Sequence, residues 1–200
     1  MNYLAHLLLA GPGDPALLGA FLGDFVKGRD LSGFPPEIRR EILVHRHVDS
    51  RTDQHPAVQA AKAYFEPTRR RFAGIALDVF YDHVLAQHWP KYGHGPLDAF
   101  TARVYRVFEQ NAALMPDTAR DVAGRMARQD WLGAYARREG LERALAGLGR
   151  RLSRHGERLA ACAIDLQQHQ APLAAGFHQL FPQLRVEVDA LRRHLDATRV

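Results

Sequence analysis

The sequence predicts an all-α protein, a single-domain helical bundle over residues 1–200. Apolar residues recur every three or four positions between Gly- and Pro-rich interruptions, which is typical of amphipathic helices. No run of alternating β-branched residues and no Asn-Gly hairpin signal favours strands. The 200 residues are 46% hydrophobic and 24% charged, as in globular domains that bury a core. Disorder, collagen-like repeats and a disulfide mini-protein are excluded.

Capping residues and prolines set the helix starts expected in the first half of the chain. Asn2 is a suitable N-cap, Pro35 and Pro36 suit a first turn, and Thr68 is expected to cap a long helix. Glycines and prolines set the ends. The expected helices are Asn2–Ala10, Ala16–Lys27 closed by Gly28, Pro35–Asp53, a short one from Pro56, and Thr68–Trp89.

The second half continues in the same pattern. Pro96 and Pro116 bracket one apolar-periodic stretch, and Pro182 is expected to start the last helix. No repeat period and no interdomain linker stands out. The expected helices are Pro96–Leu114, one from Asp117 or Thr118, Trp131–Arg137, Glu139–Ser153, His155–Leu173 and Pro182–Leu195.

The charge is unevenly spread along the chain. Lys and Arg number 27 against 22 Asp and Glu, and Thr118–Ala160 alone holds ten Arg and five acidic residues. A basic C-terminal half suits nucleic acid, a phosphate ester or an acidic protein as partner, although solvated helix faces explain it equally well.

Targeting and redox signals are weak. The longest apolar stretch, around Leu7–Ala10, is too short to span a bilayer, and no signal peptide is evident. The single cysteine, Cys162, excludes an internal disulfide and is interpreted as a small buried hydrophobe. A cytoplasmic protein is expected.

Four segments place His and Asp within helices that otherwise look buried. Residues four apart share a helix face, so an imidazole and a carboxylate at that spacing can bind one ion or orient one another. Each segment alone also suits a hydrogen-bonded core histidine, a cap or a surface pair. The segments contain Asn2 and His6; Asp24; His45, Asp49 and either Thr52 or Asp53; and Asp78, Asp82 and His83.

Taken together, the four segments favour a metal site, because helical bundles build such sites from inward-facing His and carboxylates. The absence of thiolate ligands favours Mn²⁺, Mg²⁺ or Fe²⁺ over structural Zn²⁺. Arg46 and the run Arg69–Arg71 are candidates for phosphate contacts, although a solvated basic turn explains the run as well. P-loop, H-E-x-x-H, G-x-S-x-G and dinucleotide-binding motifs are absent.

The ordered set of these motifs resembles the acyl carrier protein phosphodiesterase family. The likeness covers roughly the first hundred residues and extends more weakly to Asp117, Trp131-Leu132 and Phe181-Pro182. The matching motifs are Asn2-Tyr-Leu-Ala-His6-Leu, Gly23-Asp24-Phe25, Phe34-Pro35-Pro36, His45-Arg46-x-x-Asp49-x-x-Thr52-Asp53, and Asp78-x-x-x-Asp82-His83 with Trp89.

The resemblance implies an all-helical fold that is a distorted version of the HD phosphohydrolase arrangement. It also implies a Mn²⁺-dependent hydrolase that releases 4′-phosphopantetheine from the serine of holo-acyl carrier protein, a small acidic protein. One departure is His47, where the family often has Arg; it puts a phosphate or carrier contact in doubt more than the metal site.

Roles are expected as follows. The metal ligands are His6, Asp24, His45, Asp78 and Asp82; the catalytic groups are Asp24, Asp49 and His83; the substrate-binding groups are Arg46 and Arg69.

Two alternatives remain open. An HD-type nucleotide phosphohydrolase keeps the metal site and changes the substrate. A basic helical nucleic-acid-binding or scaffold protein explains the arginine-rich half but leaves the His and Asp clusters without a purpose. The resemblance favours holo-acyl carrier protein as partner, with neither nucleic acid nor membrane.

Overall fold

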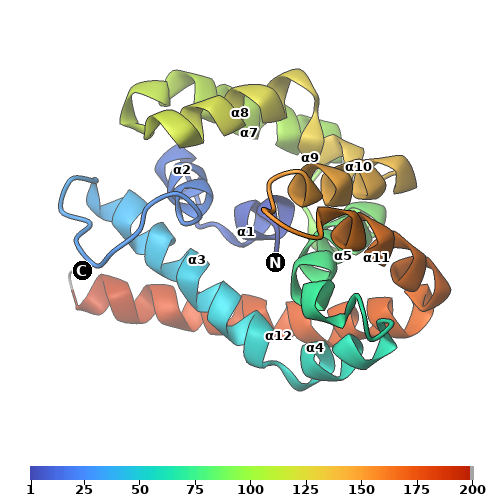
Figure 1. The fold of residues 1–200 in the computed structure, drawn as a ribbon. Helices are drawn as coiled ribbons and strands as arrows, with labels where there is room; N and C mark the ends of the chain where they lie inside the picture. The colour runs from blue at the N-terminus through green and yellow to red at the C-terminus, as the bar shows by residue number, and fades with distance from the viewer. Residues whose placement is uncertain (199–200) are drawn as a thin grey trace.

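The computed structural model describes residues 1–198, and within them every regular element is a helix (Figure 1). The prediction of an all-α fold is therefore confirmed. Three short 3₁₀ turns, Lys62–Tyr64, Arg70–Phe72 and Ala112–Leu114, separate some of the helices. The α-helices are α1 Tyr3–Leu9, α2 Asp14–Leu22, α3 Pro36–Gln54, α4 Pro56–Ala61, α5 Ala73–Gln87, α6 Trp89–Tyr92, α7 Leu97–Gln110, α8 Asp117–Arg128, α9 Trp131–Ala134, α10 Arg138–Gly149, α11 Gly156–Gln168 and α12 Gln170–Ala197.

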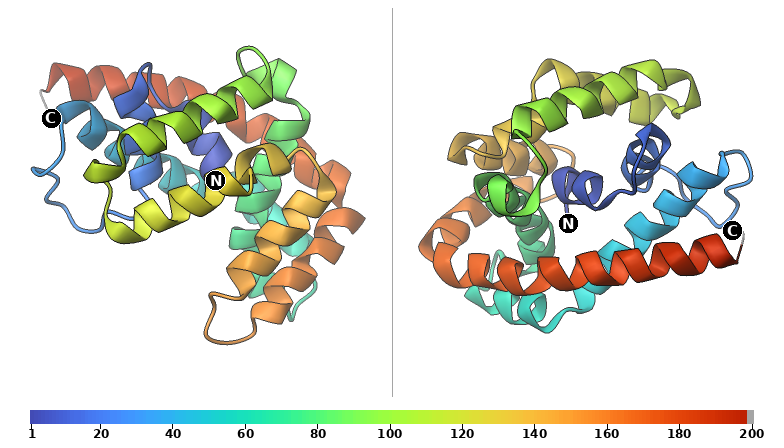
Figure 2. Two further views of the ribbon diagram at one scale, coloured as in Figure 1. Left: turned by 90° about the horizontal axis from the view of Figure 1, so that it is seen from above. Right: turned by 180° about the vertical axis from the view of Figure 1, so that it is seen from behind.

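The short, apolar helices α1 and α2 are largely buried. The helix α1 lies at the centre, with α2 and α5 against it (Figure 1). The longer helices surround it: α3 and α12 pack together on one side, and α7 and α8 form a pair on the other (Figure 2). The helix α5 contacts α1, α10, α11 and α12, which explains why its sequence is apolar on nearly every face.

A close approach of α2 and α3 fixes the geometry on which the site depends. A Cβ added at Gly19 would lie 2.6 Å from the carbonyl oxygen of Ile38, so only glycine allows this spacing. The buried Glu41 reinforces the contact region, because its carboxylate pairs with Arg192 of α12 at 2.9 Å and accepts from the Gly11 amide at 3.2 Å. These bonds tie α12 and the turn after α1 to α3.

Two expected helix boundaries are wrong for local reasons. Thr68 does not start a helix: its hydroxyl and its amide both donate to the side chain of Glu66, which stabilises a turn instead. The helix α5 begins five residues later, at Ala73. The helix α2 ends at Leu22, not Lys27, because the amides of Phe25 and Val26 both turn back to the Leu22 carbonyl.

The expected helix start at Pro182 is also wrong, because Pro182 lies inside the 28-residue helix α12. The side chain of Pro182 is exposed, so the amide that proline lacks is on the solvent side. On the buried side, Phe177 stacks on Phe181 at 5.1 Å and Leu184 continues the same face. Continuous packing across the proline therefore outweighs the lost hydrogen bond.

Among the helices of residues 1–198, none is both long enough and apolar enough to cross a membrane. The buried hydrophobic residues form one cluster that extends from Met1 to Leu195. Cys162 is fully buried within it, as expected.

Candidate metal centre

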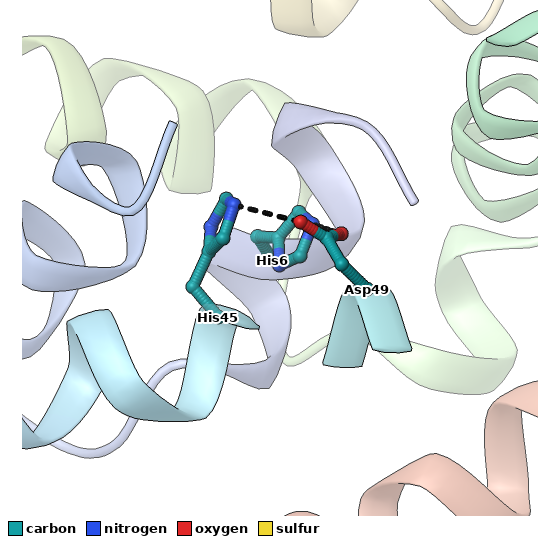
Figure 3. Close-up of side chains that lie close together, drawn as sticks. All are labelled: His6, His45 and Asp49. Carbon is teal, nitrogen blue, oxygen red and sulfur yellow. Dashed lines mark ion pairs between the residues drawn. The ribbon is translucent and has the colours of Figure 1, made fainter. Parts of the chain in front are cut away.

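Three side chains from two helices converge at the inner face of α1. His6 comes from α1, and His45 and Asp49 come from successive turns of α3 (Figure 3). Asp49 Oδ1 lies 2.9 Å from His6 Nε2, and Asp49 Oδ2 lies 3.3 Å from His45 Nε2. One ligand atom from each residue falls within 4.8 Å of the other two. The trio therefore has the size of a metal-binding cluster.

The ring of His45 is held in a fixed orientation. Its Nδ1 lies 2.7 Å from the carbonyl oxygen of Ala20, so Nδ1 carries the hydrogen and donates it. This leaves Nε2 directed at Asp24 and Asp49. Gly23 lies over the same ring: an added Cβ would come 2.2 Å from His45 Cγ. A backbone carbonyl behind one imidazole nitrogen is the usual way to orient a metal-binding histidine.

His6 is buried and lacks well-aligned hydrogen bonds. Only 4% of the residue is exposed, and neither ring nitrogen makes a hydrogen bond of good geometry despite the short approach to Asp49. Its ring stacks on that of His45 with centroids 3.7 Å apart. A buried imidazole with two unsatisfied nitrogens is costly unless a ligand completes it.

Burial and the neighbouring charges give His6 and His45 very different pKa values. Burial, with the adjacent His45, lowers the pKa of His6 to about 4. Burial opposes the charge on His45 as well, but the carboxylates of Asp24 and Asp49 raise its pKa to about 9. Burial also opposes the charge on Asp49, but the two imidazoles hold its pKa well below the usual range. At neutral pH without metal, His45 is therefore protonated and His6 is neutral.

Binding of a divalent ion should consequently release about one proton per site at pH 7.5, because His45 must lose its proton to become a ligand. Affinity should rise with pH up to about 9, the pKa of His45. Calorimetry of Mn²⁺ binding in two buffers of different ionisation enthalpy measures the proton count. His47→Gln, an exchange at a neighbouring histidine paired with Glu187, should leave the count unchanged. A count near zero in the unmodified protein would contradict the expectation.

Asp24 and Asp78 lie at the edge of this trio. Asp24 follows α2, and its Oδ1 lies 3.6 Å from His45 Nε2. Asp78, on α5, accepts from the Met1 ammonium at 2.7 Å, and that ammonium lies 3.9 Å from Asp49. The side chains of Asp24 and Asp49 are 44% and 45% exposed, so the centre opens to solvent on this side.

The structure does not bring Asp82 to the cluster. Its two oxygens accept from the amides of Leu4 and Ala5 at 2.6 and 3.0 Å. Asp82 therefore caps α1, whereas the expected cap, Asn2, makes no such bond and donates to the hydroxyl of Tyr135 at 2.7 Å. Burial raises the pKa of Asp82 to about 7 even though these amides lower it. This carboxylate positions the helix that carries His6.

Asp82→Ala should lower the free energy of unfolding by about 2–4 kcal/mol, because the buried amides of Leu4 and Ala5 lose their acceptor. Asp82→Asn should recover about half of the loss, since its carboxamide oxygen still accepts one bond. Urea unfolding followed by circular dichroism measures both. A change within about 0.5 kcal/mol for Asp82→Ala would show that the cap is not stabilising.

Three further expected site residues also lie apart from the trio. His83 is buried and its Nδ1 donates to the carbonyl of Tyr135 at 2.7 Å. Arg69 forms two bonds to Asp165 of α11, at 2.7 and 2.9 Å, so its guanidinium holds α11. Arg46 donates to the carbonyl of Val26 at 2.8 Å, in the segment that follows Asp24.

Sequence reasoning missed the groups that orient the ligands. The Ala20 carbonyl leaves no side-chain signal. The motif that contains Gly23 did include a signal, the glycine itself, but nothing in the sequence pairs it with a histidine of the next helix.

The donor set of the site is two imidazole nitrogens with one carboxylate, and a second carboxylate beside them. Such a set fits a divalent transition ion such as Mn²⁺ or Fe²⁺ better than Mg²⁺, which prefers oxygen ligands throughout.

Comparison with known proteins identifies the same family that the sequence motifs resemble. Residues 1–184 match the family model described as acyl carrier protein phosphodiesterase. A Serratia proteamaculans (strain 568) protein of that name is 36% identical over 185 residues, 92% of this chain and 95% of the relative. An Enterobacter sp. (strain 638) protein of the same name is 34% identical over 191 residues, 94% of this chain and 97% of the relative. No solved structure matches the chain.

Proposed function

Because the chain belongs to the acyl carrier protein phosphodiesterase family, and is therefore a hydrolase acting on a phosphodiester bond, we propose that it cleaves 4′-phosphopantetheine from the serine of holo-acyl carrier protein. The reaction leaves the apo-carrier. We place it at the trio His6, His45 and Asp49, with Mn²⁺ as cofactor. The observation that carries this assignment is the pair of buried imidazoles whose Nε2 atoms meet one carboxylate, with both ring nitrogens of His6 left unsatisfied.

His6, His45 and Asp49 would hold the ion, with Fe²⁺ as a second suitable occupant and Mg²⁺ as the least suitable of the three. When bound, the ion would polarise the phosphoryl oxygens and make a water in the site more acidic. The Ala20 carbonyl binds Nδ1–H of His45, so that Nε2 is the nitrogen that would bind the ion after losing its proton. The residues thus supply both the ligands and their orientation.

Asp24 is the residue that we assign to proton transfer. It is a half-exposed carboxylate beside the trio, and its contact with His45 helps to lower its pKa although burial opposes this. It accepts one proton from the attacking water as the water oxygen bonds to phosphorus. The bond between phosphorus and the serine oxygen breaks, and that oxygen takes a proton from solvent. Arg46 positions Asp24 by holding the Val26 carbonyl in the same segment.

We treat residues 1–200 as one metal-dependent phosphodiesterase domain and its helices as a distorted form of the HD phosphohydrolase arrangement. The support is that imidazole and carboxylate ligands, without thiolate, come from separate helices around an apolar interior. The likeness of the arrangement itself remains a proposal.

Intact-mass spectrometry of holo-acyl carrier protein tests the function directly. After incubation with the enzyme and Mn²⁺, the carrier should lose the mass of 4′-phosphopantetheine, and EDTA should abolish the loss. An unchanged carrier, with the enzyme folded and loaded with Mn²⁺, would exclude this substrate. Hydrolysis of guanosine or deoxynucleotide phosphates in its place would identify a nucleotide phosphohydrolase.

A further inference from the structure

A cavity of about 720 Å³ lies beside the metal centre. Its walls come from the start of α1, the end of α8, the short helix α9 and the length of α10. The helices α8 and α10 run away from α9 in different directions in the view from above (Figure 2, left). The volume is in the range of binding sites for ligands and peptide segments.

The charge of the cavity is entirely positive. Its charged lining residues are Arg125, Arg143, Arg150 and Arg151, and no acidic side chain lines it. Within residues 1–198, no carboxylate forms an ion pair with any of the four. Elsewhere in residues 1–198, eight arginines do pair with carboxylates, as Arg69 does with Asp165. Four uncompensated guanidinium groups around one cavity point to an anionic partner.

The cavity adjoins the metal centre through Tyr3, which lines it and lies one turn before His6 in α1. Burial and the nearby charge of Asp24 raise the pKa of the Tyr3 phenol to about 12, whereas the guanidinium of Arg151 acts in the opposite direction. The phenol is thus within electrostatic range of a carboxylate of the centre and of an arginine of the cavity. Arg151 also lies over the ring of Trp131, 6.0 Å from its centroid.

We propose that this arginine cavity is a docking surface for carboxylates on the carrier protein, which brings the carrier's phosphodiester to the His6, His45 and Asp49 centre. The inference rests on the proposed function, and it requires acidic side chains on the carrier near its modified serine. A protein surface fits better than a small anion, because the side chains of Arg125, Arg143 and Arg150 are exposed and belong to two separate helices and the turn that follows α10. A single phosphate is held by groups that converge on it.

A charge-reversed variant, Arg143→Glu with Arg150→Glu, tests the docking surface. Arg151 is left intact because it acts on Tyr3 beside the centre. The matched control is Arg193→Glu, an exposed residue near the far end of α12 that forms no ion pair within residues 1–198. At low salt, the KM for holo-carrier should rise about tenfold in the double variant and stay within about twofold in the control. The kcat at saturating carrier should persist, and added salt should narrow the difference.

Gly147→Phe blocks the same cavity without changing its charge. A Cβ at Gly147 would meet only the Arg150 guanidinium, at 3.8 Å, so the helix tolerates a side chain there. The variant should raise the KM for holo-carrier about tenfold and retain or increase the melting temperature, because glycine is a poor helix former. Binding of the apo-carrier, measured by fluorescence anisotropy without turnover, should weaken in both variants.

The outcomes distinguish failure of the proposed function from failure of the docking surface. If the unmodified enzyme does not act on holo-carrier, the proposed function fails and the docking surface with it. If the enzyme acts and the KM stays unchanged in both variants, the docking surface alone is wrong. If kcat falls while KM is unchanged, the arginines serve the chemistry and the docking inference is also overturned.

Discussion

Asp49→Asn should lower kcat/KM for holo-carrier by about 1,000-fold, equivalent to about 4 kcal/mol of transition-state stabilisation. Within residues 1–198, Asp49 is the one carboxylate in contact with both His6 and His45, so its charge holds the trio together. The carboxamide keeps the size of the side chain but loses the charge that attracts a divalent ion. Mn²⁺ affinity should fall in parallel, which calorimetry measures independently of turnover.

The control for this exchange is Asp53→Asn, one turn further along α3. Asp53 is exposed and lies outside the trio, so the same change in charge on the same helix should leave kcat/KM within about twofold. Equal losses in the two variants would show that net charge near α3, rather than the trio, determines activity. Full activity of Asp49→Asn would remove the trio from the mechanism.

The sequence predicts that His45 and Asp49 share a helix face, although it assigns Asp49 to catalysis rather than to the metal ligands. His45 and Asp49 are four apart on one helix, and their convergence follows from helix geometry alone. His6 is a candidate because it is one of several His and Asp residues in helices that otherwise look buried. The sequence does not show which helix packs against His6, because α1 and α3 meet only through tertiary packing.

The contacts of other expected site residues also depend on tertiary packing. Asp78 and Asp82 do share a face of α5, but that face meets the start of α1, where Asp82 caps two amides. Arg69, expected to bind substrate, pairs instead with Asp165 of α11, which is 96 residues further along the chain. The helix expected over His155–Leu173 ends at Gln168, and its orientation does not follow from the pattern. Helix periodicity therefore shows which residues share a helix face, whereas the residues they contact on other helices are determined by the tertiary fold.

Gly23→Ala should lower Mn²⁺ affinity by about 10–100-fold although it alters no proposed ligand. A Cβ at this position would lie 2.2 Å from Cγ and 2.6 Å from Cβ of His45, and real contacts do not allow either distance. The ring cannot retreat without breaking the bond from its Nδ1 to the Ala20 carbonyl. The methyl group therefore turns the ligand away from Asp49, and crowding should also cost about 1–3 kcal/mol of stability.

Gly74→Ala separates the effect on the ligand from the general effect of adding a methyl group. No atom lies within 4 Å of a Cβ at Gly74, which belongs to the first turn of α5. That variant should bind Mn²⁺ normally and be more stable by up to about 1 kcal/mol. Calorimetry and thermal unfolding of the two alanine variants distinguish the explanations. If Gly23→Ala loses stability but binds Mn²⁺ as tightly as the unmodified protein, the orientation of His45 does not control the site. If affinity falls while the protein remains folded, the packing of Gly23 against the His45 ring controls the affinity of the site for Mn²⁺.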